Sequence, residues 1–261
     1  MDNNHSLHLQ CYHQRLELKH RNCSKSAFLS LAYGSLSQLQ TKRLGFLHPR
    51  ETEYYDSLRF TKRQHSYLLG HYCAKKALKQ YYPHLETKSI LLKKGVLEQP
   101  LIDAPIHLKT HITLSHAEPL AAAIAYPEEY SIGIDIECIK SSIAQVMEDQ
   151  LTAKEKETIQ IHPVYPPETK YTLYWTAKEA ISKALRTGMT VPFTLFALKN
   201  LRWHSNYWIA EFEHFAQYQV ISFLVGDHYV CSIVYPKEST IILNTVAIYQ
   251  ALTANPVSNP S

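Results

Sequence analysis

The apolar positions of the chain first predict helices and then strands. Over residues 47–80, apolar side chains recur at roughly helical spacing, and Pro83 stands just beyond the end. This segment is therefore expected to be mostly helical. From residue 88 onward, short runs of Ile, Leu and Val are broken by Gly and Pro and predict short strands, among them 111–115 and 120–126.

The segment Ser131-Ile-Gly-Ile-Asp-Ile-Glu137 alternates with period two over its whole length, as a β-strand does. Its three isoleucines share one face. Asp135 and Glu137 share the other face, with their α-carbons roughly 6.5 to 7 Å apart on strand geometry. A strand that presents two carboxylates side by side is thus predicted here.

A second helical segment follows this strand. Thr152-Ala-Lys-Glu155 has the form of a capping box and predicts a helix start. A longer helix is expected over 170–186, ended by Gly188 and Pro192, with Glu179 and Lys183 on one stripe. The last seventy residues predict strands, and the tail 253–261 is expected to be disordered.

Composition excludes several classes of protein. Only seven glycines occur, and no two lie closer than eleven residues, which rules out GxGxxG, the Walker A loop and the GxSxG elbow. Five cysteines without a CxxC pair fit neither a zinc ribbon nor a closed disulfide framework, and HExxH is missing. Without a signal-peptide pattern or an apolar run that could span a bilayer, a cytoplasmic protein is expected.

Charge is distributed unevenly along the chain. The formal net charge is +4. Residues 41–80 hold nine Lys and Arg against three acids, whereas 131–180 hold five against eight. This polarity suits an anionic ligand held by the first half and a metal ion held by the second. Two differently charged solvated surfaces are an equal alternative.

Three carboxylates are candidates for a metal site: Asp135, Glu137 and Glu179. Magnesium takes oxygen ligands and joins carboxylates to substrate phosphates, so this set would suit it. Each motif also has a plain structural explanation. Asp135 and Glu137 would fit a solvent-facing strand, and Glu179 with Lys183 would fit a surface ion pair at i, i+4.

Three short motifs together resemble a known family. They are Leu114-Ser-His116, Ile132-Gly-Ile-Asp-Ile-Glu137 and Trp175-Thr-Ala-Lys-Glu-Ala-Ile-Ser-Lys183, in this order. In order and spacing they are similar to those of the 4'-phosphopantetheinyl transferases, specifically the larger monomeric type that activates carrier proteins of polyketide, peptide and fatty-acid synthesis. With Leu58–Arg63 and Tyr67–Gly70 upstream, the resemblance spans about residues 47–235.

The resemblance implies an α+β fold made of two similar α/β halves. These would be related by a pseudo-twofold axis, with the active site between them. We accordingly expect a basic half at 1–129 that holds the nucleotide of coenzyme A and a half at 130–252 that holds the metal and the catalytic groups.

The resemblance also assigns roles to residues. Asp135, Glu137 and Glu179 would coordinate Mg²⁺, which binds the diphosphate of coenzyme A. Lys183 would contact the phosphates, and Ser115 and His116 would lie near the nucleotide. Lys178 belongs to the same motif as Glu179 but on a helix points about 100° away from it.

The sequence departs from the family pattern twice. Glu98-Gln99-Pro100 stands where relatives often have Gly-Lys-Pro, and His71 stands where many have Arg. Other cations must replace these contacts with coenzyme A. The candidates are Lys62, Arg63, Lys75 and Lys76.

The implied reaction transfers the 4'-phosphopantetheine arm of coenzyme A to a serine of an apo carrier protein and releases adenosine 3',5'-bisphosphate. Glu179 would be the base, directly or through a water molecule, and Lys183 would neutralise phosphate charge.

An acidic carrier protein is expected to dock near residues 139–174, where Val146 and Met147 would either face the partner or complete the core. A monomer that binds neither nucleic acid nor membrane is expected. There are three alternatives. The protein would be a magnesium-dependent phosphoesterase or nuclease, a basic nucleic-acid-binding module, or an inactive paralogue that binds coenzyme A or carrier protein.

Overall fold

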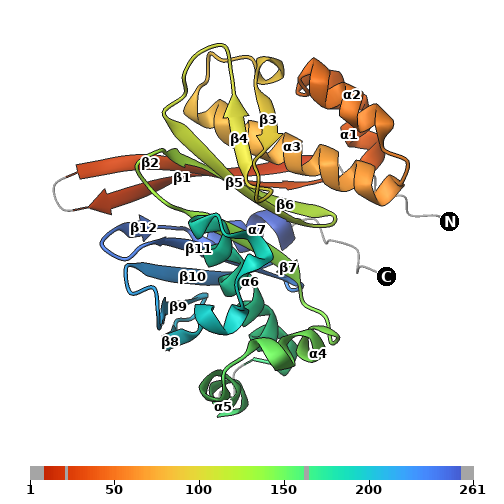
Figure 1. Ribbon diagram of the computed structural model, residues 1–261. Helices are drawn as coiled ribbons and strands as arrows, with labels where there is room; N and C mark the ends of the chain where they lie inside the picture. Colours follow the sequence, from red (N-terminus) through yellow and green to blue (C-terminus); the bar gives the residue numbers. More distant parts are fainter. Residues whose placement is uncertain (1–8, 21–22, 162–164, 254–261) are drawn as a thin grey trace.

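The computed structural model describes residues 9–20, 23–161 and 165–253. Two five-stranded antiparallel sheets form its centre (Figure 1). The first sheet has the order β12 (Thr240–Ile242), β1 (Gln10–His20), β2 (Cys23–Tyr33), β6 (Leu120–Pro127), β5 (Thr110–Ala117). The second has the order β7 (Gly133–Cys138), β11 (Tyr229–Pro236), β10 (Tyr218–Val225), β9 (Tyr207–Phe212), β8 (Leu198–Trp203).

Helices and short elements surround the sheets. The helices are α1 (Leu36–Lys42), α2 (Pro49–Ser57), α3 (Thr61–Tyr81), α4 (Ile143–Met147), α5 (Ala153–Ile161), α6 (Pro167–Leu185) and α7 (Thr245–Thr253). The hairpin β3 (Leu91–Lys94) and β4 (Pro100–Asp103) forms a separate two-stranded sheet. Single 3-10 turns lie at η1 (Arg43–Gly45), η2 (Thr87–Ser89), η3 (Glu148–Gln150), η4 (Gly188–Thr190) and η5 (Phe193–Phe196).

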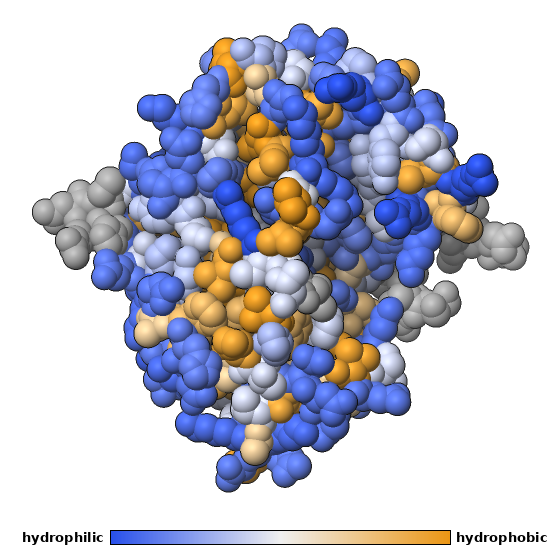
Figure 2. All heavy atoms as spheres, viewed as in Figure 1, coloured by the Kyte–Doolittle hydropathy of each residue, from blue (hydrophilic) through white to orange (hydrophobic). Residues whose placement is uncertain are grey.

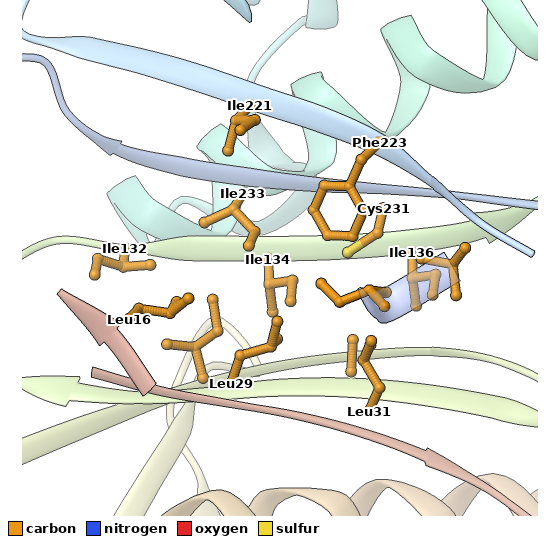
Figure 3. Close-up of a cluster of buried hydrophobic side chains, with 14 of the residues drawn as sticks. Leu16, Leu29, Leu31, Ile132, Ile134, Ile136, Ile221, Phe223, Cys231 and Ile233 are labelled. Carbon is orange, nitrogen blue, oxygen red and sulfur yellow. The ribbon is translucent and has the colours of Figure 1, made fainter. Parts of the chain in front are cut away.

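The two sheets pack face to face through one hydrophobic core. Leu16, Leu29 and Leu31 of the first sheet meet Ile134 and Ile136 of β7 and Ile132, which directly precedes that strand (Figure 3). A second core lies between α3 and the outer face of the first sheet, and a third lies between α6 and the outer face of the second. The molecule therefore has four layers in the order helix, sheet, sheet, helix.

Most of the predicted elements are confirmed. The helical segment 47–80 is divided into α2 and α3, because residues 58–60 are extended. β5, β6 and β7 agree with the predicted strands, and the α+β class is confirmed. The capping box opens α5, with the Thr152 N–H donating to Glu155 at 2.8 Å.

The last described strand pairs with the first. β12 pairs with β1, with Glu17 opposite Ile242, and Ile248 of α7 joins the core between the sheets. The sequence predicts neither β1 and β2 nor this return. Of the tail 253–261, only Thr253, the last residue of α7, lies within the described residues. No described helix is long and apolar enough to cross a bilayer.

Candidate active site

Strand β7 presents its polar face to helix α6. Ile132, Ile134 and Ile136 are fully buried on the side of the sheet core, so Gly133, Asp135 and Glu137 face the helix. At Gly133 the two elements touch, and a Cβ there would lie 1.8 Å from the backbone oxygen of Ala180. The glycine thus allows the helix to lie directly on the strand that bears the carboxylates.

Asp135 joins the three motifs at one point. Its Oδ1 accepts a hydrogen bond from the Ser115 hydroxyl at 2.7 Å and another from the Lys183 ammonium at 2.7 Å. The residue is only 2% exposed. Residues from β5, β7 and α6, widely separated in the sequence, therefore meet at a single buried carboxylate.

Glu137 and Glu179 complete a cluster of carboxylates around this point. Burial raises the pKa of Glu137 to about 7, and the negative charge of Asp135 is the next largest cause. The charge of Glu179 adds a smaller rise, and Lys183 opposes the shift. Burial and Asp135 likewise raise the pKa of Glu179 to about 7, while Lys183 opposes the shift. Negative charge here is held at a cost that a bound cation would relieve.

The donor set fits a hard divalent cation, although no ready-made site is present. Among the described residues, no three His, Cys, Asp or Glu side chains converge closely enough to hold a metal ion. Yet the buried Oδ2 of Asp135 has no hydrogen-bond partner. An unpartnered carboxylate oxygen beside two carboxylates of raised pKa has the chemistry that magnesium prefers.

A cleft of about 700 Å³ opens beside these carboxylates. Residues from α3, the β3–β4 hairpin, β5 and the C-terminal part of α6 line it, so segments on both sides of β7 in the sequence contribute. Its charged lining residues are Lys62, Arg63, His71, Lys93, Lys94, Glu98, His116, Glu179, Lys183 and Arg186. On the face drawn in Figure 2, apolar side chains gather in the middle and hydrophilic ones surround them.

His116 stands in this cleft at the end of β5. Its side chain is exposed on the cleft surface, whereas the neighbouring Ser115 is buried. Desolvation by the cleft walls, together with the Lys183 charge, lowers the pKa of the imidazole. A neutral histidine here would still bind a phosphate as a hydrogen-bond donor.

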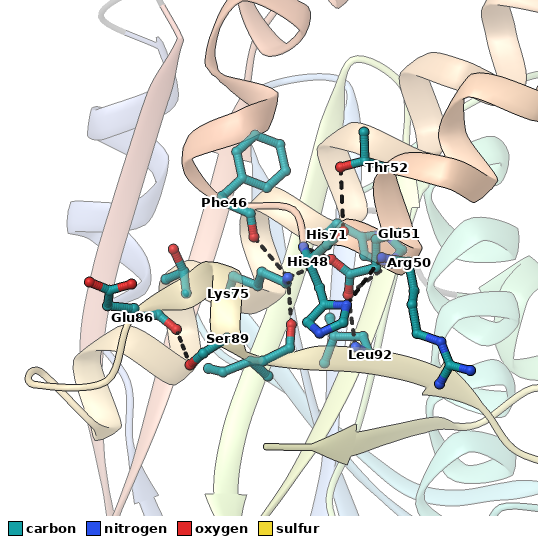
Figure 4. A network of polar contacts seen from close by, with 12 residues as sticks. Phe46, His48, Arg50, Glu51, Thr52, His71, Lys75, Glu86, Ser89 and Leu92 are labelled. Carbon is teal, nitrogen blue, oxygen red and sulfur yellow. Dashed lines mark hydrogen bonds and ion pairs between the residues drawn. The ribbon is translucent and has the colours of Figure 1, made fainter. Parts of the chain in front are cut away.

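Lys75 and Lys178 do not lie in the cleft, which corrects their expected contact with coenzyme A. Lys75 is buried and donates to Glu51 and to the backbone oxygens of Phe46 and Ile90 (Figure 4). Lys178 is buried and donates to Glu155 at 2.9 Å and to the Gln150 oxygen. Lys76 is likewise absent from the cleft lining, and its ammonium lies over the Tyr72 ring.

The two buried lysines belong to matching arrangements, one in each half. Glu51 accepts from the His48 N–H and the Leu92 N–H, both at 2.8 Å. Glu155 accepts from the Thr152 N–H at 2.8 Å and the Leu198 N–H at 2.9 Å. In each case a capping glutamate thus connects a helix start, a following strand and a buried lysine.

The structure adds three cations that the sequence did not indicate. Lys93, Lys94 and Arg186 line the cleft. Lys93 pairs with Asp103, and Lys94 pairs with Glu98. No sequence motif marks these residues, because the hairpin and the end of α6 come together only in the fold.

The expected docking segment contains both core and surface residues. Met147 is fully buried against α6, so this residue completes the core. Val146, on the same short helix, is 53% exposed. Within the segment, Ile161 at the end of α5 is also exposed.

Comparison with known proteins bears on the second half of the chain. No curated protein matches the chain significantly. A family model, described as the 4'-phosphopantetheinyl transferase superfamily, matches residues 131–234. This segment runs from the start of β7 into β11 and contains Asp135, Glu137, Glu179 and Lys183. Over residues 131–234 the chain is therefore similar to the 4'-phosphopantetheinyl transferase superfamily, the family that its sequence motifs resemble.

Proposed function

We propose that this transferase moves the 4'-phosphopantetheine arm of coenzyme A to a serine of an apo acyl or peptidyl carrier protein. Adenosine 3',5'-bisphosphate is the second product. The observation that carries the proposal is the contact of Ser115 and Lys183 with one buried carboxylate, Asp135, at the side of a cationic cleft.

The cations of the cleft suit a ligand with several phosphates. Lys62 and Arg63 are exposed in the first turn of α3, and His116 faces them from β5. The first turn of a helix also favours anions, because its N–H groups point outward. The 3'-phosphate of coenzyme A is assigned to this side of the cleft, and the diphosphate to the side of Lys183.

The transfer needs a base and positive charge near the phosphates. The carrier serine oxygen forms a bond to the β-phosphorus, and the bond from that phosphorus to the bridging oxygen breaks. The serine proton passes to Glu179, the carboxylate of the three that lines the cleft. Lys183 neutralises charge that develops on the phosphate oxygens.

Asp135, Glu137 and Glu179 are the residues that would hold magnesium. When bound, the ion supplies positive charge for the diphosphate oxygens. The chain holds Asp135 and Glu137 on the side of β7 that faces α6, and Glu179 on α6. Lys183, which pairs with Asp135 in the structure, lines the cleft beside them and would contact a phosphate there.

The acceptor is assigned to the region of α4 and α5. Val146 and Ile161 are exposed there, and Lys140 is exposed just before α4. An acidic carrier protein would be attracted by such a lysine and would cover the apolar side chains.

The test is intact-mass analysis of a panel of apo carrier proteins after incubation with this protein, coenzyme A and Mg²⁺. One added phosphopantetheine per acceptor is expected, together with release of adenosine 3',5'-bisphosphate. Asp135→Ala should abolish the added mass, and chelator should do the same to the wild type. If a known transferase modifies the panel and this protein does not, the proposal fails. Phosphate release from simple esters without coenzyme A would instead indicate a phosphoesterase.

A further inference from the structure

Arg186 adopts a backbone conformation that arginine rarely adopts. It caps the C-terminus of α6 with φ 56° and ψ 36°, in the left-handed region. Glycine is the usual residue at such a position, because a Cβ clashes with the backbone there. Of the described non-glycine residues, only Glu98, Arg186 and Asn200 have positive φ. The side chain of Arg186 therefore occupies a place where the fold alone would favour glycine.

The side chain lies in the cleft, one helical turn beyond Lys183. Arg186 is partly exposed and lines the cleft together with Lys183 and Gly188. Its charge lowers the pKa of His111, after burial, and opposes the rise that burial causes in the pKa of Tyr126. Since His111 and Tyr126 face each other across β5 and β6, the guanidinium lies at the end of these strands opposite to His116.

Arg186 differs from three of the neighbouring cations in having no carboxylate partner. Lys93, Lys94 and Lys183 each form an ion pair. Within the part of the chain that the structure describes, no ion pair with an Asp or Glu is found for Arg186, and the same holds for Lys62 and Arg63 across the cleft. The Arg186 side chain hydrogen-bonds the Tyr126 side chain, which leaves the other N–H groups of the guanidinium available to an anionic ligand.

We propose that Arg186 binds a phosphate of coenzyme A and supplies a positive charge that is absent from the Glu98-Gln99-Pro100 turn of the hairpin. The hairpin and the end of α6 lie together, since a Cβ on Gly188 would stand 3.5 Å from the Leu97 oxygen. Arg186 and the hairpin residues Leu97 and Glu98 therefore line the same cleft, the arginine from the end of α6. This inference rests on the proposed function, because it takes coenzyme A as the ligand.

Arg186→Gly is expected to affect stability and coenzyme A affinity differently. Arg186→Gly removes a Cβ from a left-handed residue and should leave the melting temperature unchanged or raise it by about 2 to 4 °C. The same change should weaken coenzyme A binding about ten- to a hundredfold, the range for a lost hydrogen bond to a charged group. A merely structural arginine would not separate stability from affinity in this way.

The experiment compares four proteins by calorimetric titration with coenzyme A and 3'-dephospho-coenzyme A, and by thermal melting. They are wild type, Arg186→Gly, Arg186→Lys and the control Asn200→Gly, which relieves positive φ at an exposed position outside the cleft. Arg186→Lys should retain more affinity than Arg186→Gly, and Asn200→Gly should bind as wild type does. A loss confined to coenzyme A assigns Arg186 to the 3'-phosphate, and an equal loss with both ligands assigns it to the diphosphate.

Two results would overturn the inference. One is wild-type affinity of Arg186→Gly for both ligands. The other is an equal loss in the lysine and glycine variants, which would show that positive charge is not what the ligand contacts. If the wild type itself binds neither ligand, the proposed function fails instead.

Discussion

Substitutions of Glu179 and Lys183 distinguish a catalytic role of these residues from a plain surface ion pair. A surface ion pair would change stability by a few tenths of a kcal/mol and leave the rate alone. In the cleft, Glu179→Gln should lower kcat at least about a hundredfold, and Lys183→Ala should also raise KM for coenzyme A. Steady-state kinetics measures both, and Glu213→Gln, exposed after β9 and outside the cleft lining, is the matched control. Normal turnover of Glu179→Gln would remove the glutamate from the mechanism.

The raised pKa values of Glu137 and Glu179 also predict a pH dependence of stability. Both rise from an ordinary value of 4.5 to about 7, so the folded protein keeps protons that the unfolded chain has lost. Unfolding then releases protons, and the free energy of unfolding falls as pH rises from about 4.5 to about 7. In chelator, the melting temperature of the wild type should fall more across this window than that of Glu137→Gln/Glu179→Gln. Parallel curves for the two proteins would contradict the predicted shifts.

The site carboxylates could be predicted from the sequence, but the buried lysines could not. Alternation with period two is enough to place Asp135 and Glu137 on one face of a strand. Because Lys178 directly precedes Glu179 on a helix, the sequence shows that the two side chains point in different directions. It does not show that Lys178 pairs with Glu155. Burial of a lysine depends on a partner from another element, and this partner is invisible to local spacing.

At the scale of elements, the contact between α6 and β7 depends on Gly133. Gly133→Ala would drive a methyl group into the backbone of Ala180, so the helix must shift away from the strand. We expect a loss of about 1 to 3 kcal/mol in the free energy of unfolding and a lower kcat, because Glu179 and Lys183 move with the helix. Urea denaturation and kinetics measure the two effects. Gly45→Ala is the control, since nothing lies within 4 Å of its added Cβ. Equal behaviour of the two variants would show that the helix tolerates the shift.

The buried pair of Lys178 and Glu155 predicts a purely structural effect. Lys178→Met leaves the buried Glu155 carboxylate without its cation, which should cost about 3 to 5 kcal/mol of stability. KM for coenzyme A should stay at the wild-type value in the folded fraction, unlike the effect of Lys183→Ala. Denaturation and kinetics below the melting temperature test this. A raised KM without loss of stability would return Lys178 to the binding site.

At the scale of the whole molecule, local patterns predicted the interior strands and missed the first two. β5, β6 and β7 have apolar runs or strict alternation, whereas β1 contains polar and charged residues along much of its length. β1 is recognisable as a strand only by its pairing with β2 and β12. Pairing between distant segments leaves no periodic signal, so the return of the chain to its first sheet could not be foreseen.

The pairing of β12 with β1 has a consequence for folding during synthesis on the ribosome. β12 is made after every other described strand, yet it forms the edge beside β1, which precedes them all in the sequence. During synthesis the first sheet therefore has an open edge at β1, with unpaired backbone groups that could join another nascent chain. Only when residues 240–253 emerge can β12 pair with Glu17–Lys19 of this edge and α7 place Ile248 in the core between the sheets. Pairing of β12 with β1 is thus a late step, and a chain cut before residue 240 would be prone to aggregate.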